Sequence, residues 1–457
     1  MTAPGNALTE VIGILRSRFS RERMGGRVAR GTLQTMLVNG AGAAASFVVQ
    51  VALARLLGAI GYGTYLLVMG WLAIAQLFGK MELDVTCVRF VGSYVATGRW
   101  GLLRGFLRSS RTAVIATSFA IAVLSALGIL LFADGLRDKH PDLPLTLLVA
   151  CPLLPVATLL LLEGAVLQGL HRYAEAQLPI NLLRPLTFGL LILIAYFFAD
   201  ITMTAPLAVV GNLLSALVAL GVTYAWRKRA IPAEVRAAAP AYDKRTWART
   251  AYPLLTVSAG QLIISQQADI VVVGVMLTTA QAAVYGAASQ LTMPLVLAAS
   301  SVTFVAQSMI ADLYSRDPAR LQSLIRAVTW ISTALSLPIA LGLILLGPHL
   351  LGLYGPRFVH GHSVLIILTI AQLVIGLAGS LAGYLLTMTA HEREAAWIIG
   401  VSAAFNLVLA LVLTPIYGEV GTASATLIAA VGRALALRVY IRRAMGLRVP
   451  AFKSVRT

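Results

Sequence analysis

Polar side chains inside two of the apolar stretches of this sequence form patterns that favour ligand binding. The first set is Asn39, Ser46 and Gln50, and the second set is Ser258, Gln261, Ser265 and Asp269. Asn39, Ser46 and Gln50 follow one another at spacings of seven and four residues, and so do Ser258, Ser265 and Asp269, with Gln261 as an additional member. At about 100° per residue each set forms one stripe along a helix. Because polar groups are costly against lipid, both stripes are expected to face protein or a water-filled space.

The chemistry that these side chains offer is hydrogen bonding to a polar ligand, with one charged group among them. An intramembrane carboxylate such as Asp269 indicates a proton site, a cation site or the partner of an arginine. For the uncharged members the alternative is structural, because amides and hydroxyls also join one membrane helix to the next. Both interpretations of the stripes remain open at the level of sequence.

A third polar group contains an arginine that lies well inside an apolar stretch. Gln177, Asn181 and Arg184 share one helical face, and Pro185 follows directly. One interpretation is that Arg184 pairs with Glu163 across the tight turn that joins the two segments. The other is that its planar guanidinium lines a cavity and binds an anionic headgroup.

The sequence offers no pattern for making or breaking covalent bonds. It has no Cys/His cluster with metal-ligand spacing, no glycine-rich phosphate loop, no nucleophile elbow and no HExxH motif. We therefore expect no enzymatic activity, no catalytic residues, no metal and no cofactor. Cys87 and Cys151 are predicted at different depths in the membrane, so a disulfide between them is not expected.

The elements that must carry these residues are long apolar helices. The 457 residues are 58% hydrophobic and 12% charged, with a mean hydropathy of +0.84, which exceeds what a water-soluble core of this size buries. About 20 apolar residues cross a bilayer as a helix, and about twelve stretches reach that length. The predicted spans are 30–54, 61–80, 112–133, 143–170, 174–199, 203–226, 249–276, 280–308, 325–347, 358–386, 395–416 and 419–441. The predicted fold class is an all-α polytopic membrane protein.

The net charge of +18 is explained by where the basic residues lie. Most of the 36 Lys and Arg residues fall before the first span, after the last span or in alternate connections, above all within 80–111 and 227–249. By the positive-inside rule both termini and these connections are cytoplasmic. Because aromatic residues are not interleaved with the basic runs, the charge does not indicate nucleic-acid binding.

The order of the spans predicts two halves with the same orientation. The turn Leu57–Tyr65 after the first span has a counterpart at Leu277–Tyr285 after the seventh. We therefore expect two six-helix lobes related by a pseudo-two-fold axis along the membrane normal, with a central cavity. The predicted domains are a basic cytoplasmic N-terminal arm 1–29, an N-lobe 30–226, a cytoplasmic linker 227–248, a C-lobe 249–442 and a basic cytoplasmic tail 443–457. The arm has the spacing of an interfacial helix, and the alternative is a disordered basic segment.

Short motifs of another kind follow one another along the chain. They are Ala54–Gly58, Tyr62–Tyr65, Glu82–Asp84 with Arg89–Phe90, Leu167–Tyr173, Leu386–Arg393, Asn406–Leu409 and Thr414–Gly418. In order and spacing this set resembles polysaccharide flippases of the multidrug/oligosaccharidyl-lipid/polysaccharide exporter superfamily. The resemblance covers about residues 30–445 and is to the translocases of O-antigen or exopolysaccharide units.

The resemblance implies a transporter that moves an undecaprenyl-pyrophosphate-linked oligosaccharide from the inner to the outer leaflet of the bacterial cytoplasmic membrane by alternating access. It implies a cationic central cavity for the pyrophosphate and sugar, to which the Arg184 face and the polar stripes correspond. The second half places no obvious Lys or Arg deep in its spans. The implied partners are the lipid-linked oligosaccharide and membrane lipids, with a polysaccharide polymerase and glycosyltransferases as further candidates.

Charged residues of the third matched motif suggest a gate. Glu82, Asp84 and Arg89 lie at the predicted cytoplasmic surface, where we expect an ion-pair cluster that holds a gate closed in preference to binding substrate. Glu163 is a further candidate for such an ion pair.

Other functions remain open. A cation-coupled multidrug exporter of the same superfamily would share the fold, but such proteins commonly carry a carboxylate in the first helix and residues 31–54 contain none. Asp269 keeps this alternative open. A lipid II flippase usually has fourteen spans. From a different class, the chain fits a non-transporting membrane scaffold of a polysaccharide-assembly complex, for which neither Arg184 nor Asp269 would be needed.

Overall fold

The computed structural model describes residues 23–135, 141–198, 202–299, 318–376, 385–386 and 392–445. Every regular element in these ranges is a helix, which confirms the predicted all-α class. The predicted N-terminal arm as far as residue 22 and the predicted tail from residue 446 lie outside the described residues.

The chain forms two compact units, and their boundary lies between Ala259 and Gly260. We call residues 23–259 the N-terminal unit and the described residues from 260 onward the C-terminal unit. This boundary lies beyond the predicted linker 227–248, because part of that linker packs on the N-terminal unit. Trp247 Nε1 donates to Tyr94 OH at 2.9 Å, and the Trp247 ring meets Phe106 edge-on with centroids 5.1 Å apart.

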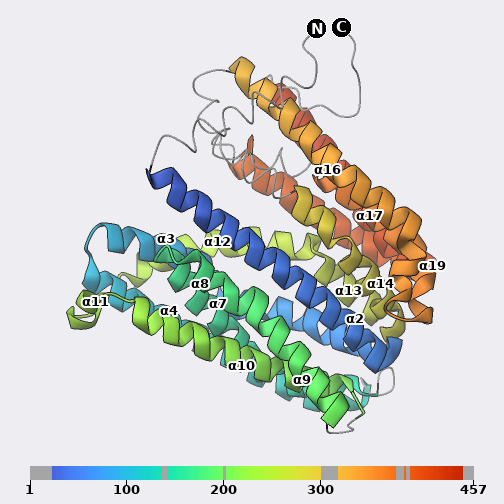
Figure 1. Ribbon diagram of the computed structural model, residues 1–457, viewed down its shortest axis with the longest axis horizontal. Helices are drawn as coiled ribbons and strands as arrows, with labels where there is room; N and C mark the ends of the chain where they lie inside the picture. Colours follow the sequence, from blue (N-terminus) through green and yellow to red (C-terminus); the bar gives the residue numbers. More distant parts are fainter. Residues whose placement is uncertain are drawn as a thin grey trace. The chain divides into compact units, whose positions relative to one another are not determined.

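The N-terminal unit is built from helices that run back and forth between two ends (Figure 1). They are α2 (Arg23–Lys80), α3 (Leu83–Ala96), α4 (Trp100–Leu131), α6 (Leu143–Ala150), α7 (Leu153–Gly169), α8 (Tyr173–Leu178), a π-helical turn (Pro179–Leu183), α9 (Arg184–Phe198), α10 (Ala205–Ala230), α11 (Ala233–Ala237) and most of α12 (Lys244–Ile264). Helix α7 is apolar almost all round, so it is buried against α10, α3, α4 and α2.

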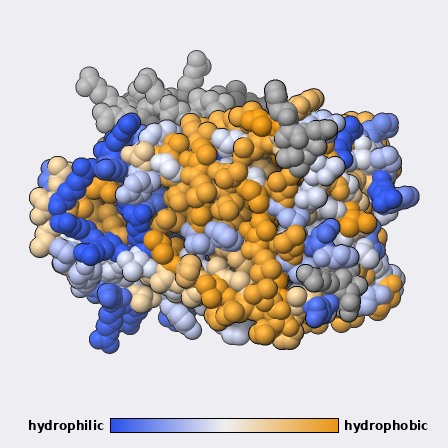
Figure 2. Space-filling view, turned by 90° about the horizontal axis from the view of Figure 1, so that it is seen from below, coloured by the Kyte–Doolittle hydropathy of each residue, from blue (hydrophilic) through white to orange (hydrophobic). Residues whose placement is uncertain are grey.

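The connections predicted to be cytoplasmic gather at one end of the N-terminal unit. In Figure 1 the start of α4, helix α3 and helix α11 lie together there. Ala241 N donates to Gly101 O at 2.9 Å, which ties the two most basic connections together. Figure 2 shows hydrophilic side chains at this end and a broad apolar surface across the middle of the same face, as lipid contact requires.

The C-terminal unit has a similar pattern of long and short helices. They are α13 (Gln266–Met276), α14 (Thr279–Leu291), α16 (Pro318–Gly352), a 3-10 turn (Pro356–Gly361), α17 (His362–Val374) and α19 (Glu392–Met445). Helix α14 is rich in Ala, and its small side chains are buried where it packs against α13 and α17. Small residues let membrane helices approach closely, so α14 forms the centre of this unit.

The described residues contain 8 helices long and apolar enough to cross a membrane, or up to 10 if each bent pair is one span. Two of these helices are too long for one crossing, since 43 and 52 residues exceed the roughly 20 that a bilayer needs. Each is interrupted by a glycine with positive φ, Gly58 at 66° and Gly418 at 64°. Both breaks fall between two predicted spans, which is compatible with twelve spans; that number remains a prediction.

Candidate functional site

Arg184 begins α9 and lies half-buried in the N-terminal unit. Its Nε and Nη2 atoms donate to Asn212 Oδ1 at 3.3 and 2.8 Å. Asn212 Nδ2 donates in turn to Tyr65 OH at 2.9 Å. Within the described ranges no carboxylate forms an ion pair with Arg184. Among the described residues, its positive charge is therefore held in place by neutral groups alone.

The predicted polar face beside Arg184 is brought together by the π-helical turn Pro179–Leu183. Asn181 Nδ2 donates to Asn39 Oδ1 at 2.8 Å and to Gln177 Oε1 at 2.6 Å. The turn approaches α2 so closely that a Cβ on Gly42 would lie 2.0 Å from the Asn181 carbonyl oxygen. A glycine at position 42 is thus what allows Asn39 and Asn181 to meet. Asn39 of the first polar stripe is therefore joined to Gln177 and Asn181 of the Arg184 face in one hydrogen-bonded cluster.

Two further residues of the first stripe lie along α2 beyond this contact. Ser46 and Gln50 are half-buried. Gln50 Oε1 is buried and accepts no hydrogen bond within the described protein. An amide oxygen in that state is costly, so it is available to a donor from a ligand.

The second predicted stripe does not run along one helix, and that part of the prediction is wrong. Helix α12 ends at Ile264, and the separate helix α13 begins at Gln266. Ser265 has extended backbone angles at the break, and its Oγ donates to Leu262 O at 2.6 Å. The rule of 100° per residue fails across such a break, so Ser258 and Gln261 lie on a different helix from Asp269.

Asp269 is enclosed by hydrogen-bond donors of the C-terminal unit and is 2% exposed. Tyr285 OH and Thr426 Oγ1 donate to its Oδ2 at 3.0 and 2.9 Å. Asn406 Nδ2 approaches Oδ1 at 3.5 Å. Within the described residues no Lys or Arg forms an ion pair with it. The carboxylate joins α13 to α14 and to both halves of α19.

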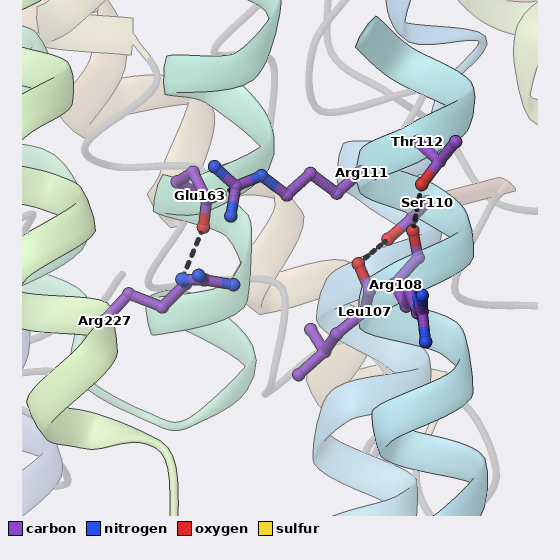
Figure 3. A network of polar contacts seen from close by, with 7 residues as sticks. All are labelled: Leu107, Arg108, Ser110, Arg111, Thr112, Glu163 and Arg227. Carbon is purple, nitrogen blue, oxygen red and sulfur yellow. Dashed lines mark hydrogen bonds and ion pairs between the residues drawn. The ribbon is translucent and has the colours of Figure 1, made fainter. Parts of the chain in front are cut away.

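Glu163 pairs with arginines other than Arg184. Its Oε2 lies 2.7 Å from Arg227 Nε, and its Oε1 lies 3.7 Å from Arg111 Nε. Figure 3 shows both arginine side chains converging on this carboxylate, which is 1% exposed. The interpretation that Glu163 and Arg184 pair across their hairpin is therefore wrong. Both lie near the same turn, but Glu163 faces α10 and α4.

The predicted gate residues form a smaller ion-pair cluster than expected. Lys80 Nζ lies 2.8 Å from both Glu82 Oε1 and Asp84 Oδ2. Arg89 is exposed and makes no ion pair within the described residues. The cation of this cluster is Lys80, which the sequence analysis assigned only to the end of a span.

The partners that the sequence analysis missed are mostly neutral. Asn212, Tyr65, Tyr285 and Thr426 complete the two intramembrane sites, yet hydroxyls and single amides are common in membrane helices. Asn212 is the one amide side chain in the predicted span 203–226, and this could have indicated a polar contact inside the membrane. Arg227 directly follows the apolar residues of its span, a position at which a basic residue indicates topology and gives no sign of a buried ion pair.

Comparison with solved structures identifies the fold. An inward-facing multidrug resistance transporter of the MATE family is 14% identical over 90% of this chain and 94% of its own, with a TM-score of 0.66. The lipid II flippase MurJ in an inward closed conformation is also 14% identical, covering 87% and 86%, with a TM-score of 0.66. A MOP superfamily transporter from Pyrococcus furiosus is 12% identical, covering 91% and 95%, with a TM-score of 0.62. The chain has the two-lobe fold of these MOP transporters.

Sequence comparison identifies the family. No curated protein matches the chain closely enough to be a relative. The family described as polysaccharide biosynthesis protein matches residues 28–312, which is more than half of the 457 residues and includes the Arg184 cluster. The resemblance expected from the short motifs is thereby confirmed, and the chain belongs to the polysaccharide biosynthesis protein family.

Proposed function

We propose that this protein moves an undecaprenyl-pyrophosphate-linked oligosaccharide from the inner to the outer leaflet of a bacterial cytoplasmic membrane by alternating access, for O-antigen, capsule or exopolysaccharide assembly. The family and the fold shared with the lipid II flippase support a lipid-linked substrate. Both termini are cytoplasmic in this proposal, as the positive charge predicts. A polysaccharide polymerase and glycosyltransferases would be its functional partners.

One observation carries this proposal: Arg184 lies inside a predicted membrane span, and no described carboxylate neutralises its charge. A guanidinium has five N–H donors, and Asn212 accepts from two of them. The remaining donors suit the oxygens of a pyrophosphate, which a planar fork binds with two parallel hydrogen bonds. An arginine in hydrocarbon is costly without such a partner, so a ligand that supplies negative charge explains its presence.

The neighbouring amides suit the sugar part of the same substrate. Asn39, Gln177 and Asn181 form a connected set next to Arg184, and Gln50 offers an unused acceptor. Sugar hydroxyls donate and accept at once, so amide side chains are matched partners for them. In this scheme the Lys80 cluster with Glu82 and Asp84 stabilises one state of the cytoplasmic end.

The test follows a labelled undecaprenyl-pyrophosphate oligosaccharide across the bilayer of liposomes that contain the purified protein. Arg184→Ala is expected to lower the transfer rate at least tenfold, because a charge-assisted bidentate contact contributes about 1.5–3 kcal/mol. Arg245→Ala, at an exposed position outside the spans, is the matched control and should transfer normally.

Other outcomes would point to the other functions. Cation-driven efflux of an organic dye without transfer of any lipid-linked glycan would replace the proposal by a multidrug exporter, with Asp269 as its coupling site. Equal rates for wild type and Arg184→Ala would remove Arg184 from the substrate site. Assembly of polysaccharide in cells with both Arg184→Ala and Asp269→Asn would favour a scaffold.

A further inference from the structure

A hollow of about 460 Å³ at the basic end of the N-terminal unit is lined almost entirely by cations where it is polar. It lies among α4, α10 and α11. Its charged residues are Arg104, Arg108, Arg111, Arg227, Lys228 and Arg236, and no carboxylate lines it. So many like charges around one hollow repel one another unless an anion occupies it.

The protein itself supplies little negative charge to this hollow. Glu163 does not line the hollow, and its one carboxylate forms ion pairs with both Arg111 and Arg227. The guanidinium carbons of Arg111 and Arg227 also lie 5.0 and 4.9 Å from the centre of the Tyr224 ring, so both arginines make a cation–π contact with this one ring. The Glu163 carboxylate and the Tyr224 ring together leave a net positive charge even at this inner part of the hollow.

Backbone contacts fix the outer arginines without neutralising them. Arg104 Nη1 donates to Arg236 O at 2.8 Å and to Ala238 O at 2.7 Å. Arg236 Nη2 donates to Lys228 O. These contacts hold α11 and the chain after it against α4 and α10. Carbonyl groups orient a guanidinium but carry no net charge, so both arginines keep a positive charge that can attract an anion.

The depth of the hollow matches the level of lipid headgroups. Its residues on α4 come just before the predicted span 112–133, and those on α10 come just after the predicted span 203–226. The positive-inside rule assigns this end to the cytoplasm. Phosphates of the cytoplasmic leaflet lie at this level, and basic pockets between helices on this side suit anionic lipids.

An apolar groove of about 650 Å³ adjoins the hollow and shares Arg108 and Thr112 with it. Its walls include Phe106, Trp247 and Tyr252. A soluble phosphate has no apolar surface to bury against these residues, whereas an acyl chain would bury apolar surface there. The pair of sites therefore fits a molecule with an anionic head and a hydrocarbon tail.

We propose that the cationic hollow binds the phosphate headgroup of an anionic phospholipid of the cytoplasmic leaflet, with one acyl chain in the adjoining groove. Arg108 and Lys228 line the hollow with exposed side chains, and among the described residues the hydrogen bonds found for these two residues involve their backbone carbonyls only. The site is separate from Arg184 and is independent of what the protein transports.

Native mass spectrometry of the full chain in detergent tests this proposal, with phosphatidylglycerol or phosphatidylethanolamine added at equal concentration. Wild type should retain phosphatidylglycerol in preference. The double variant Arg108→Ala/Lys228→Ala should bind phosphatidylglycerol about thirtyfold more weakly, since each basic residue near a membrane surface contributes ~1 kcal/mol. Neither side chain supports the fold, so this variant should remain folded.

The matched control is Arg245→Ala/Arg249→Ala, which removes two exposed charges from the same basic end but outside both pockets. It should keep the wild-type preference. An equal loss in this control, or no preference in wild type, would overturn the proposal. Displacement of the lipid by millimolar inorganic pyrophosphate at the same site would identify a soluble phosphate site and would overturn the lipid assignment. Because no transport is measured, a failed flippase proposal leaves this result unchanged.

Discussion

The two units place opposite charges inside their apolar spans. The N-terminal unit holds a cation, Arg184, and the C-terminal unit holds an anion, Asp269, and neither has an ion-pair partner among the described residues. Arg184 is half-buried and is bound by one amide oxygen, whereas Asp269 is 2% exposed and has donors at both oxygens. The difference separates a charge that the fold leaves available from one that the fold uses to join helices.

The largest expected effect concerns the stability of the C-terminal unit. Asp269→Ala would leave the donors of Tyr285, Asn406 and Thr426 without an acceptor. An unsatisfied buried donor costs about 1–3 kcal/mol, whereas removal of a buried charge relieves part of its desolvation cost. We therefore expect the free energy of unfolding to fall by ~3 kcal/mol. Denaturant unfolding of the purified protein measures it.

Asp269→Asn is the control for this prediction, since it removes the charge but keeps one acceptor oxygen. It should be closer to wild type than Asp269→Ala. If Asp269→Ala were as stable as wild type, Asp269 would not be the structural centre of its unit, and the contrast between the two charges would fail.

The second effect should appear in transport and hardly in stability. Arg184→Gln removes the charge but keeps donors for Asn212, so we expect a change of ~1 kcal/mol or less in the free energy of unfolding. Transfer of the lipid-linked oligosaccharide should fall at least tenfold, because the anionic headgroup loses its charged partner. Thermal unfolding and the liposome assay, run on the same preparation, separate the two effects. A large loss of stability in Arg184→Gln would make Arg184 a structural residue like Asp269.

The third effect concerns a carboxylate that does have cationic partners. Glu163→Gln should destabilise the N-terminal unit by about 2 kcal/mol, since Arg227 is 12% exposed and would lose its counter-ion. The share from Arg111 is small, because that side chain is 38% exposed and its pairing is screened by water. In a double-mutant cycle with Arg227→Gln, a coupling energy near zero would show that the ion pair adds nothing.

Much of the fold could be predicted from the sequence, because membrane-spanning helices are recognised by their length and apolar composition. The sequence also predicted that Asn39 and Asn181 face protein or a polar space, but it did not predict that they contact each other. The pairing of Glu163 could not be predicted, because distance from a turn fixes the depth of a residue but leaves open which neighbouring helix it faces. The break at Ser265 was missed because a regular polar spacing assumes an unbroken helix, and serine is compatible with both.

The smallest effect is on the reactivity of a thiol near the Glu163 ion pair. Cys87 is fully buried, and burial, followed by the negative charges of Glu163 and Asp84, raises the pKa of its thiol. A raised pKa means less thiolate at neutral pH, so a maleimide should label Cys87 slowly in a Cys151→Ser background and rapidly after unfolding. Mass spectrometry of timed samples gives both rates. Fast labelling of the folded single-cysteine protein would show that α3 opens to solvent far more readily than its packing against α7 suggests.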